Sequence, residues 1–70
     1  MIKSYEEATK YLISAGWRKE NAGIFHKNNW ELVWDTSHYV EIYVGKERIA
    51  EGSIDSREDM VNFINVNNLI

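Results

Sequence analysis

Residues 30–44 read WELVWDTSHYVEIYV, and this stretch decides the fold. On each side of Asp35-Thr36-Ser37, large apolar residues alternate with a second set that contains two glutamates and two tyrosines. A period of two residues is typical of β-strands that bury one face of a sheet. The residues expected on the buried face are Trp30, Leu32, Trp34, Val40, Ile42 and Val44.

The length of the central loop sets the pairing of these two strands. A loop of Asp35-Thr36-Ser37 alone keeps Trp34 and Val40 on one face, whereas a loop one residue shorter or longer would place them on opposite faces. Burial therefore favours the loop at 35–37. The resulting pairs are Trp34 with His38, Leu32 with Val40, and Trp30 with Ile42.

The following hairpin has two interpretations. A tight turn at Gly45-Lys46 would pair Ile42 with Ile49. A longer loop would instead place Ala50 and Ile54 inside the fold. We favour the tight turn, because glycine suits the first central position of a type II′ turn.

A helix is predicted on the N-terminal side, over residues 5–15. Ser4-Tyr5-Glu6-Glu7 has the pattern of a capping box, with Ser4 as the N-cap. Gly16 would end the helix in a left-handed conformation, with Trp17 contacting Leu12. The apolar stripe of this helix consists of Tyr5, Ala8, Leu12 and Ala15.

A second helix is predicted over residues 57–66. Ser56-Arg57-Glu58-Asp59 is a weaker capping box, and Asp55 is the rival N-cap. We expect the Asn67-Asn68 pair to fray the helix end, because asparagine has poor helix propensity. The inward stripe consists of Met60, Phe63 and Ile64, with Val61 at its edge.

The segment 17–28 is open to two interpretations. Asn21-Ala22-Gly23 could be the turn of a hairpin whose first arm is Trp17 to Glu20, or part of a loop that leads into a single strand at Ile24–Asn28. The other candidate strands are 30–34, 38–44 and 47–54. The prediction is thus a single two-layer α+β domain over residues 1–70: an N-terminal helix, a three- or four-stranded antiparallel meander, and a C-terminal helix. Both helices would cover the apolar sheet face.

Composition excludes several classes of protein. A 70-residue chain is one domain, and its three tryptophans are expected in the core because so small a domain has little surface to bury. The absence of cysteine excludes disulfides and cysteine-based zinc sites. A net charge of −3 argues against direct nucleic-acid binding, and no apolar run approaches the roughly 20 residues of a membrane span. We expect a cytoplasmic protein, since no signal-peptide pattern opens the chain.

The residues that could carry chemistry have simpler explanations. His38 follows Asp35 closely enough for a hydrogen bond, but a turn-capping Asp35 and a strand-start His38 explain the pair. His26 is expected as a half-buried sheet residue. The acidic pairs Glu6-Glu7 and Glu58-Asp59 fall in the first turns of helices, where the helix dipole favours them. No serine lies in a G-x-S-x-G context, and no glycine-rich phosphate loop is present. We therefore assign no catalytic residue, metal ligand or cofactor.

Residues 11–17, YLISAGW, followed by a β segment that carries a histidine, resemble small HicA-type toxins over about the first third of the chain. That resemblance implies a ribonuclease with an α-β-β-β-α order like that of double-stranded-RNA-binding domains, and His26 as the counterpart of the catalytic histidine. The sequence before His26 is Gly23-Ile24-Phe25, where that family has a Gly-Ser-His-type sequence.

The outward face of the predicted sheet gives the functional hypothesis. Tyrosine is enriched at protein interfaces, because it offers a large contact area at low entropic cost. We expect a non-catalytic domain that binds a larger protein, the profile of phage- or plasmid-encoded inhibitors of host machinery such as anti-CRISPR and anti-restriction proteins. A His26-dependent HicA-like nuclease and a self-associating module, possible as a homodimer, are the alternatives. The predicted partner-binding residues are Glu31, Val33, Tyr39, Glu41 and Tyr43.

Overall fold

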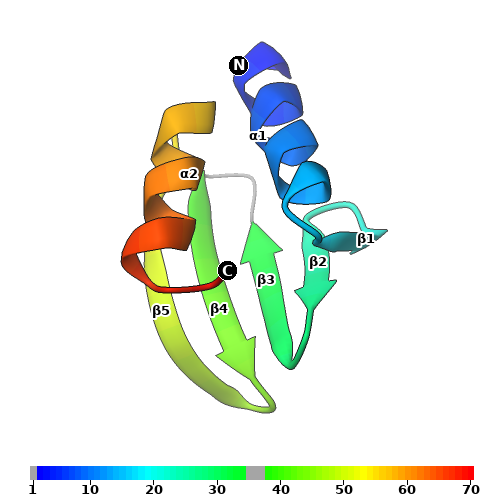
Figure 1. Ribbon diagram of the computed structural model, residues 1–70, viewed down its shortest axis with the longest axis vertical. Helices are drawn as coiled ribbons and strands as arrows, with labels where there is room; N and C mark the ends of the chain where they lie inside the picture. Colours follow the sequence, from blue (N-terminus) through cyan, green and yellow to red (C-terminus); the bar gives the residue numbers. More distant parts are fainter. Residues whose placement is uncertain (1, 35–37) are drawn as a thin grey trace.

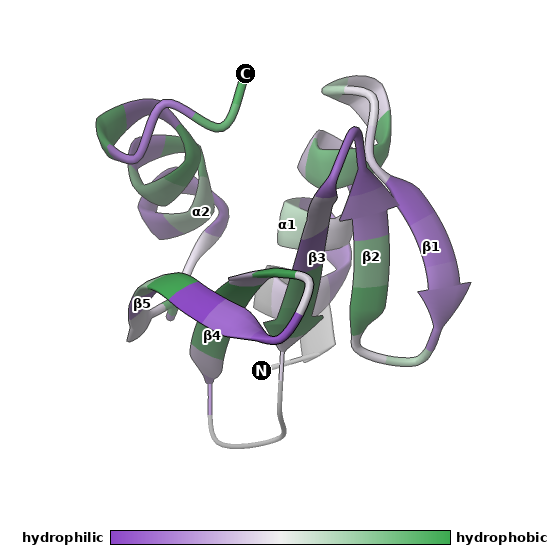
Figure 2. Ribbon diagram, turned by 90° about the horizontal axis from the view of Figure 1, so that it is seen from below, coloured by the Kyte–Doolittle hydropathy of each residue, from purple (hydrophilic) through white to green (hydrophobic). Residues whose placement is uncertain are grey.

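The computed structural model describes residues 2–34 and 38–70 and shows two helices packed on one side of an antiparallel sheet (Figures 1 and 2). The five strands form a meander in the order β1-β2-β3-β4-β5. The predicted α+β class and helix–meander–helix order are confirmed, with one strand more than expected. The elements are α1 (Ile2–Ser14), β1 (Arg18–Asn21), β2 (Ile24–Lys27), β3 (Trp30–Trp34), β4 (Tyr39–Val44), β5 (Glu47–Ser53) and α2 (Arg57–Val66).

Helix α1 begins earlier than predicted and ends at Ser14, one residue before the predicted end. It starts at Ile2, so Ser4 lies inside the helix and the predicted capping box is wrong. A capping-box pattern does not stop a helix by itself, and Ile2-Lys3 contains no residue that would. At the other end Gly16 has a φ of +99°, and the Trp17 amide donates to the Leu12 carbonyl at 2.9 Å. This is the predicted Schellman ending.

Helix α2 spans the predicted residues and has Ser56 as its N-cap. The Asp59 amide donates to Ser56 Oγ at 3.1 Å, and Asp59 Oδ2 accepts from the Asp55 amide at 2.9 Å. The rival N-cap at Asp55 is therefore wrong. Fraying at Asn67-Asn68 is also wrong: Asn68 takes a φ of +59°, and the Leu69 amide donates to the Ile64 carbonyl at 2.9 Å. Leu69 is only 2% exposed, so burial of its side chain holds this helix end closed.

The β3–β4 register differs from the prediction by two residues. Trp34 pairs with Val40 and Leu32 with Ile42, so the expected Trp34–His38 pair is wrong. His38 has a φ of +69°, outside the extended region, and belongs to the connection rather than to the strand. Because a shift of two residues preserves side-chain direction, the predicted buried face survives the error. The predicted loop at 35–37 lies outside the described residues.

The β4–β5 hairpin contains a β-bulge. The tight Gly45-Lys46 turn is confirmed by the pairing of Val44 with Glu47, but Ile42 then pairs with Ala50 instead of Ile49. Ile49 is 48% exposed, whereas Ile54 is 2% exposed, as the longer-loop alternative expected. Without the bulge, Glu51 would lie opposite Val40 on the core face. One extra residue in β5 reverses the direction of the side chains that follow and keeps that carboxylate out of the core.

The segment before β2 forms the first arm of a hairpin, as one of the two interpretations expected. β1 pairs antiparallel with β2, with an irregularity between Lys19 and Asn21. The turn packs against the end of β3, where the Trp34 amide donates to the Gly23 carbonyl at 2.8 Å. Gly23 has a φ of +79°, and a Cβ there would lie 2.6 Å from the Trp34 carbonyl oxygen. Only glycine fits this position without strain.

The core lies between the helices and the inward sheet face. Trp17 and Trp34 are buried, and half-buried Trp30 stacks on Trp17 with ring centroids 6.1 Å apart, so all three tryptophans contribute as expected. Val44, also expected inside, is 39% exposed at the end of β4. In the part of the chain that the structure describes, neither helix is long and apolar enough to cross a membrane. The buried core residues are Ala8, Leu12, Trp17, Phe25, Leu32, Trp34, Val40, Ile42, Ile54, Met60, Phe63, Ile64 and Leu69.

Candidate functional site

The sheet face opposite the two helices is the candidate site, and we call it the open face. Strand register brings one residue from each strand into a single row across it: Arg18, His26, Glu31, Tyr43 and Arg48. A second row contains Ile24, Val33, Glu41 and Glu51. The open face is completed by Glu20 on β1 and Tyr39 on β4.

The five predicted partner-binding residues all lie on this face. Each is half-buried, with its side chain packed among neighbours on the sheet surface and still within reach of solvent. They come from only two adjacent strands, β3 and β4. The structure thus gathers them into one patch, and their binding role stays a prediction. The five are Glu31, Val33, Tyr39, Glu41 and Tyr43.

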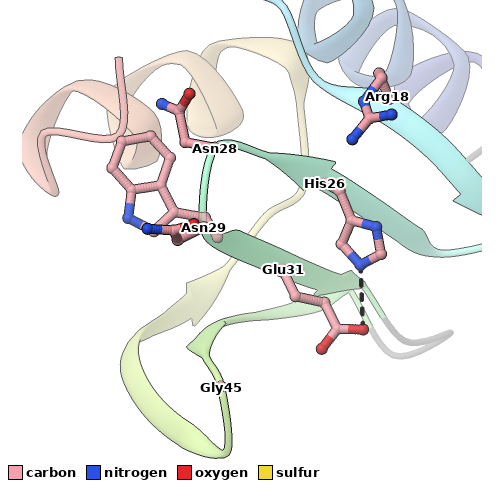
Figure 3. Close-up of a pocket in the computed structure, with 7 residues that line it drawn as sticks. Arg18, His26, Asn28, Asn29, Glu31 and Gly45 are labelled. Carbon is pink, nitrogen blue, oxygen red and sulfur yellow. Dashed lines mark hydrogen bonds and ion pairs between the residues drawn. The ribbon is translucent and has the colours of Figure 1, made fainter.

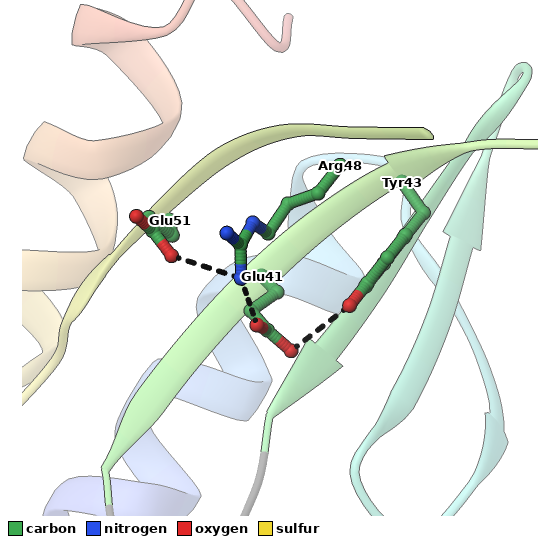
Figure 4. Close-up of polar contacts among 4 residues, drawn as sticks. All are labelled: Glu41, Tyr43, Arg48 and Glu51. Carbon is green, nitrogen blue, oxygen red and sulfur yellow. Dashed lines mark hydrogen bonds and ion pairs between the residues drawn. The ribbon is translucent and has the colours of Figure 1, made fainter. Parts of the chain in front are cut away.

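An ion-pair network joins the predicted patch to β5 (Figure 4). Arg48 Nη1 lies 2.9 Å from Glu41 Oε2 and 3.2 Å from Glu51 Oε1. The Tyr43 hydroxyl donates to Glu41 Oε1 at 3.2 Å, so both oxygens of Glu41 are engaged. Glu41 and Glu51 are direct cross-strand partners. Like charges in such a pair are destabilising, and the Arg48 guanidinium between them offsets the repulsion.

This network also affects proton affinities. A hydrogen bond to Glu51, with partial burial and the nearby negative charge, raises the pKa of Tyr39. Partial burial, with the charge of Glu41, raises the pKa of Tyr43. The hydrogen bond to Glu41 raises the pKa of Arg48. At neutral pH both phenols are therefore neutral donors, and Arg48 stays charged.

At the other end of the open face, His26 lies between two carboxylates. Its Nδ1 is 2.7 Å from Glu20 Oε1. Its Nε2 is 3.4 Å from Glu31 Oε2, the contact drawn in Figure 3. The side chain is 31% exposed, as expected for a half-buried sheet residue. An open hollow of about 370 Å³ adjoins it. The hollow is lined by Arg18, His26, Asn28, Asn29, Trp30, Glu31 and Gly45.

The sequence did not reveal six members of the open face: Arg18, Glu20, Ile24, His26, Arg48 and Glu51. Alternation along 18–26 would have placed the first four, once the β1–β2 hairpin had been chosen over a loop. Arg48 and Glu51 are three residues apart, so a regular strand would turn their side chains to opposite faces. The bulge between them turns both toward the open face.

The other chemistry-bearing groups lie apart from one another. His38 Nδ1 is 3.7 Å from Asp55 Oδ1, in an exposed position, and its predicted partner Asp35 is outside the described residues. Glu58 and Asp59 occupy the first turn of α2, as predicted. Within residues 2–34 and 38–70, no three histidine or acidic side chains are arranged to hold a metal ion. His26 and His38 have different carboxylate partners and form no common site.

Comparisons of the chain with protein-family models, with curated proteins and with solved structures find no match. On the open face, aromatic, apolar and charged side chains meet within reach of solvent.

Proposed function

We propose that this domain is a non-catalytic protein-interaction module that binds a larger protein through its open face. One observation carries the proposal: Tyr39 and Tyr43 lie beside Val33 on a sheet face that neither α1 nor α2 covers, and each of the three is only half-buried. Interfaces favour tyrosine, since its ring supplies apolar area and its hydroxyl a hydrogen bond.

The size of the domain is compatible with this role. A standard protein–protein interface buries about 800 Å² on each partner. That is less than a fifth of the 4548 Å² that the domain exposes. The open face crosses all five strands, which are spaced about 4.8 Å apart. A partner would thus dock on one continuous surface.

Occupying a partner's surface is also a way to inhibit it. We extend the proposal to an inhibitor of host machinery, encoded by a phage or another mobile element and of the anti-CRISPR or anti-restriction type. A small acidic chain with no catalytic motif has this profile. The domain would act by covering a site on its target, with no chemical step of its own.

The test is affinity capture from the native host with matched variants. We expect the wild type to capture a defined protein, and Tyr39→Ala/Tyr43→Ala to lose it by about tenfold or more, as for interface hot spots. The control is Val66→Ala/Ile70→Ala, which truncates two exposed apolar residues outside the open face. Circular dichroism would verify that both double variants fold. Equal capture by the wild type and the tyrosine variant would refute the proposal.

A second candidate, a small HicA-like nuclease, is favoured by the position of His26. Its Nδ1 is held by Glu20, and Arg18 lines the same hollow, so an oriented imidazole lies near a group that binds phosphate. The measurement is RNA cleavage by the purified domain, with His26→Ala and His38→Ala as the variants. If His26→Ala alone abolishes cleavage while folding is unchanged, the non-catalytic proposal fails.

A further inference from the structure

The outward side of β4 carries an aromatic–acidic stripe that consists of Tyr39, Glu41 and Tyr43, and we call it the β4 stripe. Its three side chains come from alternate residues of one strand and point to the same side. A carboxylate binds a guanidinium through charge-assisted hydrogen bonds, and the face of a phenol ring attracts a cation. A carboxylate flanked by two phenols therefore combines both ways of recognising an arginine side chain.

The structure already shows a guanidinium at this stripe. Arg48 reaches across from β5 and places Nη1 2.9 Å from Glu41 Oε2, and its charge acts on both tyrosines. Half of its side-chain surface remains exposed, so the pair it makes is open to competition from solvent and from a partner. The internal contact shows that the carboxylate of the stripe, Glu41, accepts a hydrogen bond from a guanidinium.

The charge around the β4 stripe favours a cation as well. The open face carries four glutamates against two arginines and one histidine: Glu20, Glu31, Glu41 and Glu51 against Arg18, Arg48 and His26. Glu41 and Glu51 are direct cross-strand partners, an arrangement that disfavours folding. Surplus negative charge on one face attracts a positively charged surface and speeds its encounter.

We infer that the partner's docking surface is basic, and that the β4 stripe binds one of its arginine side chains in competition with Arg48. This inference rests on the proposed function and names the chemistry of the partner. Glu31 and Glu51, on the strands to either side of β4, would contact further cations of that surface. A protein groove that normally holds nucleic-acid phosphates has this character, and an acidic domain seated in it would exclude the nucleic acid.

The test is an NMR titration of the ¹⁵N-labelled domain with two peptide probes. One is a short glycine peptide with two arginines, and the other replaces both arginines by citrulline, which keeps the shape and removes the charge. We expect the arginine peptide to shift amides of residues 39–43 and 48–51, and the citrulline peptide to bind about fivefold more weakly or worse. Binding should also weaken between about 50 and 300 mM salt.

Matched variants separate the stripe from general acidity. Glu41→Gln should weaken the arginine peptide about fivefold. Glu58→Gln, which makes the same change in net charge at an exposed position of α2, should change it less than about twofold. Glu41→Gln also removes an ion pair with Arg48, so a second variant is needed. Glu51→Gln, at an exposed position, should likewise weaken binding of the arginine peptide.

Several results would overturn the inference. One is equal binding of the arginine and citrulline peptides, and another is amide shifts centred on the helices. A third is a loss of arginine-peptide binding in Glu58→Gln as large as that in Glu41→Gln, which would indicate unspecific attraction. Failure of the proposed function has a different signature. If the captured protein depends on Tyr39 and Tyr43 but the arginine peptide leaves the β4 stripe unshifted, the interaction proposal stands and the basic partner does not. If the wild type and Tyr39→Ala/Tyr43→Ala capture the protein equally well, the proposed function itself fails.

Discussion

The two faces of the sheet differ sharply, although they are made by the same strands. Leu32 and Ile42 are completely buried, whereas their neighbours Val33, Glu41 and Tyr43 are half-buried on the other side. The inward face is apolar and packs against two helices, and the outward face is joined by ion pairs and tyrosine hydrogen bonds. The inward face thus provides stability and the outward face the candidate site. Because adjacent residues of a strand point to opposite faces, substitutions at adjacent positions can test the two roles separately.

The largest expected difference lies between Leu32→Ala and Val33→Ala, on opposite faces of β3. Removal of the Leu32 side chain leaves a cavity in the core and should lower the free energy of unfolding by about 2–5 kcal/mol. Val33→Ala should lower it by about 1 kcal/mol or less. Chemical denaturation measures both. Similar losses of unfolding free energy in the two variants would show that Val33 is packed as tightly as Leu32 and that the open face is covered.

A smaller difference is expected between two glycines with left-handed backbone. Gly23→Ala brings a Cβ to 2.6 Å from the Trp34 carbonyl oxygen, while a Cβ at Gly45 meets nothing within 4 Å. Gly45→Ala should destabilise the domain by about 1 kcal/mol, the strain of a positive φ alone, and Gly23→Ala by roughly 2 kcal/mol or more. Thermal unfolding would measure the two variants. Equal shifts in midpoint would contradict the close packing of the β1–β2 turn on β3.

The ion-pair network on the open face should contribute less. Arg48→Gln leaves Glu41 directly opposite Glu51 and should lower the denaturation midpoint slightly, with a greater loss at low salt. Adding Glu51→Gln to this variant should restore part of the stability, because the repulsion disappears with the charge. A double-mutant cycle in denaturant tests the coupling. Independent effects of the two substitutions would rule out the bridging role of Arg48.

The smallest effect is the alkaline titration of Tyr39 and Tyr43. Their pKa values are raised in the folded state, so the neutral phenols favour folding. Their contribution is fully present below the unfolded pKa of about 10 and is lost as pH rises through the folded values. Tyrosinate absorbance should therefore develop at higher pH in the native protein than in denaturant. The double variant Tyr39→Phe/Tyr43→Phe should lack the part of the absorbance change that occurs at the highest pH. Coincident titrations would contradict the carboxylate contacts of these hydroxyls.

Local signals in the sequence were sufficient for several elements. Gly16 and Trp17 predicted the end of α1, and Ser56 predicted the start of α2, because caps depend on a few adjacent residues. Alternation placed Glu31 and Glu41 on the outward face. The start of α1 was missed, since the Ser4 pattern stabilises a helix start without requiring one. The closed end of α2 was missed because it depends on burial of Leu69.

By itself, the sequence determined which side chains of β3 and β4 turn inward, because that depends only on the two-residue period of a strand. The tertiary structure decided the register, which alternation fixes only to within two residues, as the Trp34–Val40 pair shows. It also decided the bulge at Ile49, because burial of Glu51 is a problem only once β5 lies beside β4. Contacts between Glu41, Arg48 and Glu51 follow from that bulge. The charge arrangement on the open face is therefore a property of the folded chain.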